Sequence, residues 1–159
     1  MLTFELINNS TTRSQAKYHS MFHLDYAENR LIEVYSKSGY LILMYTSKGK
    51  SEDTQNQLEI PILSLLWIKE SILNGFWKKP SDGGFPKNKH ACKAIFETEV
   101  ILISRSMNAG YPGKMGVKIV NKSRSSHILP TWPQEIQITD DAVKAHLLPV
   151  IDKLTEGID

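Results

Sequence analysis

The chain has 159 residues and a formal net charge of +2, with 41% hydrophobic and 23% charged residues. This composition is typical of a soluble globular protein, and it excludes a disordered chain, a collagen, a coiled coil and a disulfide scaffold. The length suits a single domain over residues 1–159. The one cysteine, Cys92, cannot form an intramolecular disulfide, which favours a reducing, cytoplasmic location.

The first residues lack the basic and then apolar pattern of a signal peptide, so we expect none. The longest apolar stretch, residues 60–68, is interrupted by Pro61 and Ser64. It is far shorter than the roughly 20 residues that cross a bilayer. We therefore expect no membrane contact.

The first half of the chain predicts mainly strands, because apolar and polar residues alternate, most clearly over residues 18–26. The predicted strands cover residues 4–7, 18–26, 31–35, 40–46 and 58–62. Turns are predicted at residues 29–30 and 37–39, and a polar loop or hairpin tip over 47–56. Ser64 then predicts the N-cap of a helix over 65–74, with Gly75 at its C′ position.

The second half repeats this order. A long, mobile, basic loop is predicted over 78–90, followed by strands over 92–96, 100–104, 116–121 and 135–138, with a glycine-rich turn over 108–116. Thr139 predicts the N-cap of a helix over 140–155, with Asp140 and Asp141 in the turn where the helix dipole favours acids. Pro149 is expected to kink that helix.

Both halves thus consist of antiparallel strands followed by a short strand that leads into an amphipathic helix. The predicted fold class is α+β: antiparallel sheet or sheets with two helices, in the pattern of a duplicated strands-then-helix unit. The pseudo-repeat halves would be residues 1–77 and 91–159, joined by the basic loop 78–90. The likeness between the halves is one of pattern, not of residue identity.

Charge is distributed unevenly along the chain. Residues 78–134 carry ten basic and three acidic side chains, net +7, whereas residues 1–77 are near neutral and residues 135–159 are net −4. No Asp or Glu occurs between Val100 and Gln134. A block of one sign is typical either of an anion-binding surface or of a solvated face balanced elsewhere, and the two interpretations remain open.

Aromatic residues are interleaved with this basic block, at Phe76, Trp77, Phe85, Phe96, Tyr111 and Trp132. Basic side chains can neutralise phosphates, and exposed rings can stack on bases without reading sequence. The pattern predicts single-stranded DNA or RNA binding that is largely independent of sequence. The candidate contacts are Trp77, Lys78, Lys79, Lys87, Lys89, Arg105, Tyr111, Lys114, Lys118, Lys122 and Arg124.

No pattern of catalytic or metal-ligating residues stands out. His19 and His23 are four residues apart on a predicted strand, about 13 Å, which is too far for one zinc ion. Cys92 has no base at a telling spacing, although His90 and His127 are present. We therefore expect neither an enzyme nor a cofactor or metal site.

The order strands, helix, long loop, strands and strand-into-helix resembles that of the Whirly-like single-stranded nucleic-acid-binding proteins. In that family a short strand leads into a helix twice; here these segments would be residues 58–76 and 136–154. The Lys-Gly-Lys-Ala motif of the family has a partial counterpart at Lys48-Gly49-Lys50, but Ser51 follows it. The resemblance implies a sheet surface that binds unpaired strands and a homo-oligomer assembled through the helices.

One alternative is a protein-interaction module, such as a small inhibitor or immunity-type protein. Such a module would carry an exposed apolar patch rimmed by charge. An enzyme of unrecognised type is the less favoured alternative, and a deep pocket with perturbed titratable groups would support it.

Overall fold

The computed structural model of the chain describes residues 1–24, 27–109 and 112–158. The chain forms two four-stranded antiparallel sheets, each with its strands in sequence order. The first sheet contains β1 (Lys17–Leu24), β2 (Ala27–Lys37), β3 (Tyr40–Lys48) and β4 (Asp53–Pro61). The second contains β5 (Ala91–Phe96), β6 (Glu99–Ser106), β7 (Gly116–Ser125) and β8 (Pro133–Thr139).

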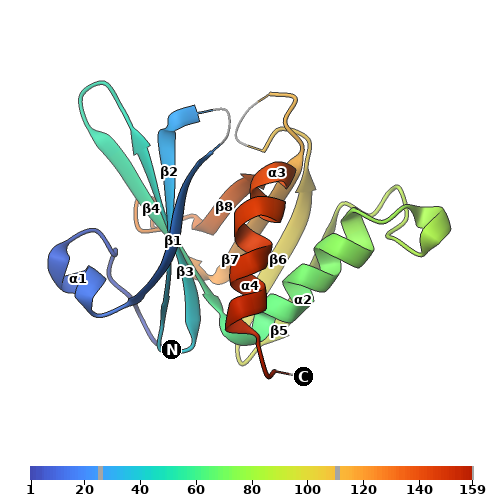
Figure 1. Cartoon of the computed structure of the whole chain (residues 1–159), viewed down its shortest axis with the longest axis horizontal. Coiled ribbons are helices and arrows are strands. Elements are labelled where there is room, and N and C mark those ends of the chain that lie inside the picture. The colour runs from blue at the N-terminus through green and yellow to red at the C-terminus, as the bar shows by residue number, and fades with distance from the viewer. Residues whose placement is uncertain (25–26, 110–111, 159) are drawn as a thin grey trace.

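A helix follows each sheet (Figure 1). After β4, a 3₁₀ turn (Ile62–Ser64) leads into α2 (Leu65–Glu70), which continues as a π-helical segment (Ser71–Phe76). After β8, α3 (Asp140–Ala142) continues through a π-helical segment (Val143–Leu147) into α4 (Leu148–Leu154). The predicted α+β class, with antiparallel sheets and two helices, is confirmed.

The β2–β3 hairpin is closed by a two-residue turn within the predicted turn at residues 37–39. Its turn residues Ser38 and Gly39 both have positive φ, 52° and 85°. A two-residue turn with both angles positive matches the twist of the strands that it joins. The predicted turn at residues 37–39 therefore sets the register in which Lys37 pairs with Tyr40.

Two predicted irregular segments are strands instead. Residues 29–30 lie inside β2, where Arg30 pairs with Ser47, and most of the predicted loop 47–56 belongs to β3 and β4, where Lys48 pairs with Asp53. Polar residues occur here because the ends of a hairpin face solvent even while its backbone ladder continues. Only four residues, 49–52, remain as the hairpin tip.

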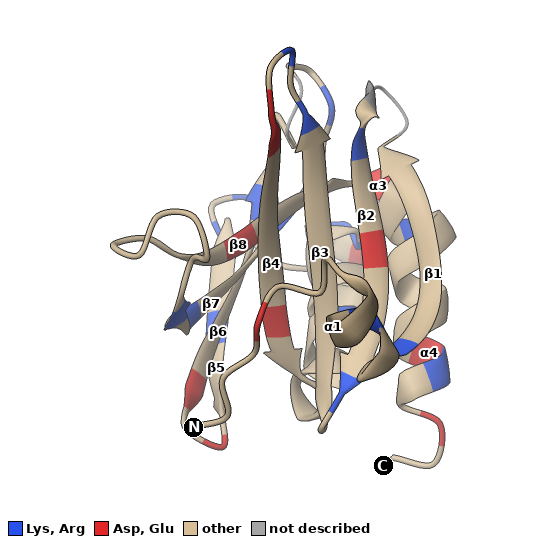
Figure 2. Cartoon of the chain, turned by 90° about the vertical axis from the view of Figure 1, so that its left-hand side faces the viewer, with Lys and Arg blue, Asp and Glu red and all other residues tan. Residues whose placement is uncertain are grey.

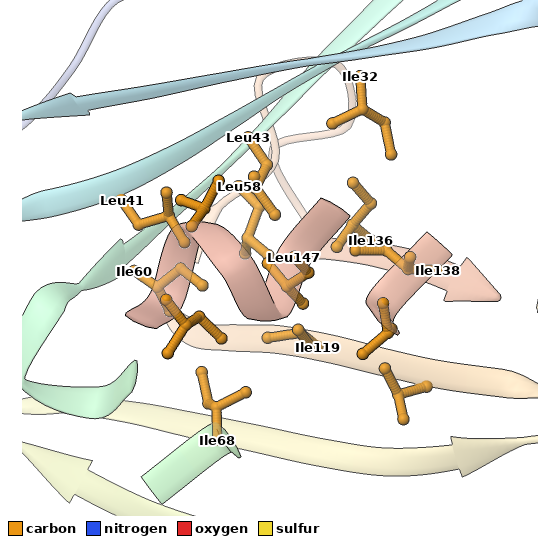
Figure 3. Packing of buried hydrophobic residues seen from close by; sticks show 14 of the residues in the cluster. Ile32, Leu41, Leu43, Leu58, Ile60, Ile68, Ile119, Ile136, Ile138 and Leu147 are labelled. Carbon is orange, nitrogen blue, oxygen red and sulfur yellow. The ribbon is translucent and has the colours of Figure 1, made fainter. Parts of the chain in front are cut away.

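The main hydrophobic core lies between the two sheets and the two long helices (Figure 3). It is built largely from Ile and Leu side chains at alternating strand positions and at helical spacing, including Ile32, Leu43, Ile68, Ile119 and Leu147. On its margin, the rings of Phe22 on β1 and His146 stack at 4.3 Å between centroids. The C-terminal helix thus contacts both sheets, β1 through His146 and β7 through α3, and this packing couples the two halves.

The predicted strand over residues 4–7 is wrong. This segment has no strand partner; it crosses the outer face of the first sheet, where Ile7 is buried against Tyr35 and Met44. Its backbone bonds to a side chain instead, because Ile7 N donates to Gln57 Oε1 (2.9 Å) and Gln57 Nε2 donates to the carbonyl of Glu5 (3.0 Å). The short helix α1 (Ser10–Ser14) follows on the same face, as Figure 2 shows.

The helix boundaries also differ from prediction. Ser64 Oγ donates to the carbonyl of Pro61 (2.7 Å) and makes no cap bond to the helix. Gly75 lies within the π-helical segment rather than beyond its end, and a Cβ there would come within 2.4 Å of the Phe85 ring. In the last helix the π-helical turn precedes Pro149, consistent with the accommodation of a residue that lacks a backbone donor.

Candidate nucleic-acid interface

The predicted contact residues occupy several different environments. The exposed ones are Lys78, Lys79, Lys87, Lys89, Lys114 and Lys122, whereas Trp77, Arg105 and Lys118 are half-buried and Arg124 is buried. Tyr111 lies outside the described residues. The chain segment with net +7 charge is therefore not one continuous basic surface, and each part is considered by its own contacts.

Arg124, on β7, lies inside the protein between two glutamates. Its Nε donates to Glu99 Oε1 at 2.5 Å and its Nη1 to Glu59 Oε1 at 3.3 Å, and only 4% of the side chain is exposed. The guanidinium also lies over the ring of Tyr40, 4.7 Å from its centroid, and near Phe4. These contacts make Arg124 a buried structural cation, so it is not available as one of the predicted surface contacts.

The same polar cluster connects the two sheets. Glu59 on β4 accepts from Gln134 Nε2 (3.0 Å) and lies 2.6 Å from His127 Nε2, while its backbone N donates to Gln134 Oε1 (2.9 Å). Asn121 Nδ2 donates both to the Glu59 carbonyl (2.8 Å) and to Glu99 Oε1 (3.1 Å). A buried carboxylate needs such a set of hydrogen-bond partners to offset the free-energy cost of removing its charge from water.

Ionisation of this cluster reflects those bonds. Burial alone would raise the pKa of Glu99, but hydrogen bonds from Arg124, Tyr40 and Asn121 outweigh it and hold the pKa below the ordinary glutamate value. Burial, followed by the bond to Glu99, raises the pKa of the Tyr40 phenol. Both directions favour an ionised Glu99 that accepts from a neutral Tyr40 and a charged Arg124.

Arg105 and Trp77 meet at a single carboxylate, that of Asp140 in the first turn of α3. Arg105 binds it in bidentate fashion, with Nη1 to Oδ1 at 2.6 Å and Nη2 to Oδ2 at 2.8 Å. Trp77 Nε1 donates to the same Oδ1 at 3.0 Å. Thr139 Oγ1 accepts from Ala142 N (3.3 Å), which confirms the predicted cap. These contacts tie the end of the first long helix to the start of the second.

The basic loop 78–90 is folded back on the helix that precedes it. Phe85 N donates to the carbonyl of Gly75 (3.0 Å), and the Phe85 ring contacts Phe76 edge-on at 5.0 Å. Gly84 N donates to the Lys79 carbonyl (2.9 Å), and Lys89 Nζ lies 4.4 Å above the Phe85 ring. Phe85 is thus half-buried, which leaves the loop with exposed lysines but without a fully exposed ring.

The outer face of the second sheet carries a different group of lysines. Figure 1 shows the long helices on one side of this sheet. On the other side, the register places Lys93 opposite Leu102, and Lys118 between Ser104 and Gln137. Asn121, the last residue of β7 in register with β6, is buried and bonds to Glu59 and Glu99, so the exposed Lys122 that follows it faces the outer side, roughly 13 Å along β7 from Lys118. Beyond Lys122 the register with β8 shifts, and Arg124 turns inward.

These three lysines, Lys93, Lys118 and Lys122, differ in their exposure to solvent and in their ion pairs. Lys93 and Lys122 are exposed. Lys118 Nζ lies 3.5 Å from Glu135 Oε2, with both side chains about one-third exposed, so screening by water makes this a weak pair. Lys93 is not among the predicted contacts. The available signal was a lysine inside the predicted strand over 92–96, where a charged side chain is expected to face solvent. By contrast, the basic residues of the first sheet lie at or near strand ends: Lys17, Arg30, Lys37 and Lys48 (Figure 2).

Trp132 lies beside this face in the loop between β7 and β8, and 58% of its surface is exposed. The sequence pattern included it among the interleaved aromatics but did not select it as a contact. Ser126 holds the first part of this loop, because its Oγ accepts hydrogen bonds from the backbone N of Ile128 and of Leu129 (both 3.2 Å). Trp132 N donates to the Leu129 carbonyl and its own carbonyl accepts from Ser126 N (both 2.8 Å).

The described residues contain no group of three or more His, Cys, Asp or Glu side chains that could hold a metal ion. His19 Nε2 is 2.7 Å from Ser36 Oγ. Burial, and then the charges of Lys153 and Lys17, lower the pKa of His19. Cys92 Sγ lies 3.7 Å from Ser71 Oγ and is half-buried.

No helix of the described residues is long and apolar enough to cross a membrane. No protein-family model matches the chain, and no curated protein sequence matches it significantly. The function must therefore be inferred from the residues of the chain itself.

Proposed function

We propose that the protein binds single-stranded DNA or RNA, largely independently of sequence, across the outer face of the second sheet. The observation that carries the proposal is the placement of Lys93, Lys118 and Lys122 on one sheet face that the long helices leave open. Such an array can neutralise successive phosphates of an extended strand.

The surface between these lysines suits unpaired bases better than a duplex. Leu102 and Val100 are half-buried on the same face, and Trp132 is exposed at its margin. Apolar and aromatic groups contact the flat faces of bases, which a duplex keeps stacked inside. Ser104 and Gln137 supply neutral polar groups on the same face.

In this arrangement no nucleic-acid contact involves Arg124, Arg105 or Trp77, because carboxylates already bind them. The exposed lysines at residues 78–90, and Lys114, form basic areas outside the sheet face. They would attract a strand over distance without fixing its path.

The direct test is the fluorescence anisotropy of a labelled 20-nucleotide single strand, as DNA and as RNA, titrated with the full chain. The proposal predicts binding at micromolar protein in low salt, with an association constant that falls steeply as salt rises. A duplex of the same sequence should bind more weakly. Absence of low-salt binding to either single strand contradicts the proposal.

A second candidate function, a protein-interaction module, is favoured by one observation. Ile128 and Leu129 stand exposed beside Trp132 in the β7–β8 loop, 43% and 56% of each residue. Three large apolar side chains in one ordered loop are typical of a contact that buries them in a partner. Capture of a protein by the wild-type chain, lost with Leu129→Asp and insensitive to nuclease, would favour this function over the first.

A further inference from the structure

A hollow of about 290 Å³ opens beside Trp132, between the end of β7 and the β7–β8 loop. Its walls come from residues 122–125 on one side and 130–133 on the other. The walls therefore combine one indole ring and two prolines with Lys122 and several hydroxyl groups. A hollow of this composition is suited to a flat, partly apolar group that carries a negative charge.

Trp132 differs from the other two tryptophans. Trp67 is half-buried against the core, with its ring 5.6 Å from that of Phe96, and Trp77 is hydrogen-bonded to Asp140. Trp132 is the most exposed of the three, and the backbone bonds of its loop hold its main chain in place. A loop whose backbone is already ordered loses less conformational entropy on binding a ligand than a loop that must first be ordered.

The charge of the hollow comes from Lys122. Arg124 also lines it, but that guanidinium is bound by Glu99 and Glu59. Lys122 is exposed, and Thr131 and Ser125 are exposed on the two opposite walls. An ammonium group can bind a phosphate oxygen, and the hydroxyls can donate to or accept from a base edge or sugar.

We infer that this hollow binds one unpaired nucleotide, with its base stacked on the indole of Trp132 and its phosphate on Lys122. The inference rests on the proposed function and gives it a specific subsite. Stacking on a ring needs a base whose face is free, so the subsite selects single strands and excludes an intact duplex. Since every base has a face to stack, it adds little sequence preference.

The test combines tryptophan fluorescence with affinity, using an unlabelled and a labelled single strand of thymidines. Binding to the wild type should quench the emission of Trp132. Trp132→Ala should abolish most of that quenching and weaken binding by roughly 5- to 150-fold. Trp132→Phe should keep most of the affinity, because it retains a ring. Trp67→Phe is the matched control and should leave both quenching and affinity close to wild type.

The outcomes separate the subsite from the proposed function. If the wild type binds the strand but Trp132→Ala binds equally well, the subsite is overturned and the proposed function stands. If the wild type binds no single strand, both are overturned. Equal wild-type affinity for a blunt duplex also overturns the subsite. Thermal unfolding of Trp132→Ala should match the wild type, since the replaced ring is mostly exposed, so loss of binding reports contact rather than misfolding.

Discussion

Arg124 Nε and Glu99 Oε1 form a 2.5 Å hydrogen bond between β7 and β6, with both side chains almost completely buried. The pair belongs to the cluster that also holds Glu59 and joins the two sheets. Arg124 comes from the most basic part of the sequence, but its charge is neutralised inside the protein by Glu99 and Glu59. It therefore acts as a structural cation and not as a surface charge.

Replacing Arg124 should therefore affect folding more than binding. Arg124→Met leaves two buried carboxylates without their cation, and we expect the free energy of unfolding to fall by about 3–5 kcal/mol. Urea denaturation followed by circular dichroism measures this. The matched control is Lys122→Met, the exposed neighbour two positions away, which should change stability by less than about 0.5 kcal/mol. A stable Arg124→Met that binds oligonucleotide less well would show instead that Arg124 contacts the ligand.

The lowered pKa of Glu99 links this cluster to pH. A carboxyl group with a lower pKa in the folded state stabilises the protein above the pKa of the unfolded chain, about 4.3. That contribution is lost as pH falls through the folded value. Urea unfolding between about pH 3 and pH 7 should show Glu99→Gln as less stable than wild type at neutral pH, with the gap narrowing in acid. A gap that is constant across this range would contradict the assignment.

Trp77 should act through Asp140. Trp77→Phe keeps the apolar ring but removes the donor to the carboxylate, and a hydrogen bond to a charged group is worth about 1.5–3 kcal/mol. We expect the free energy of unfolding to fall by an amount within or just below that range, with oligonucleotide affinity unchanged. Thermal and urea unfolding, alongside anisotropy, make the comparison. Lower affinity at unchanged stability would place Trp77 in the binding surface.

Gly75 should be intolerant of a side chain because of Phe85. In Gly75→Ala the new Cβ would lie 2.4 Å from the ring, so Phe85 must move, at a cost of about 1–3 kcal/mol. Phe85→Leu creates space, and the double variant should recover part of the stability that Gly75→Ala loses. A double-mutant cycle by urea denaturation measures the coupling. Purely additive effects of the two substitutions would contradict the contact.

The features that sequence predicted correctly depend on neighbouring residues. Thr139 caps its helix because its hydroxyl reaches Ala142, three residues on, and the turn at Ser38-Gly39 depends on two residues that accept positive φ. The predicted strand over 4–7 was wrong because apolar side chains suit any buried extended chain, and here a single side chain, Gln57, satisfies the backbone.

The pairing of charged side chains could not be predicted from neighbouring residues. Arg124 belongs to a stretch without acidic residues, yet its partners Glu99 and Glu59 lie 25 and 65 positions earlier in the chain. Only the pairing of strands brings them together. Likewise, Lys93 and Lys118 are far apart in sequence, but the β5–β6–β7 register places both on one face of the second sheet.

That shared face is the central claim, and a salt titration of two triple variants tests it most directly. Lys93→Gln, Lys118→Gln and Lys122→Gln together should weaken single-strand binding and reduce the slope of log affinity against log salt by about 2, since each phosphate contact contributes about 0.7. The control, with Lys17, Lys48 and Lys50 changed to Gln, removes the same charge from the first sheet and its β3–β4 hairpin tip, and it should keep the wild-type slope. Equal slopes for the two triple variants would contradict the account.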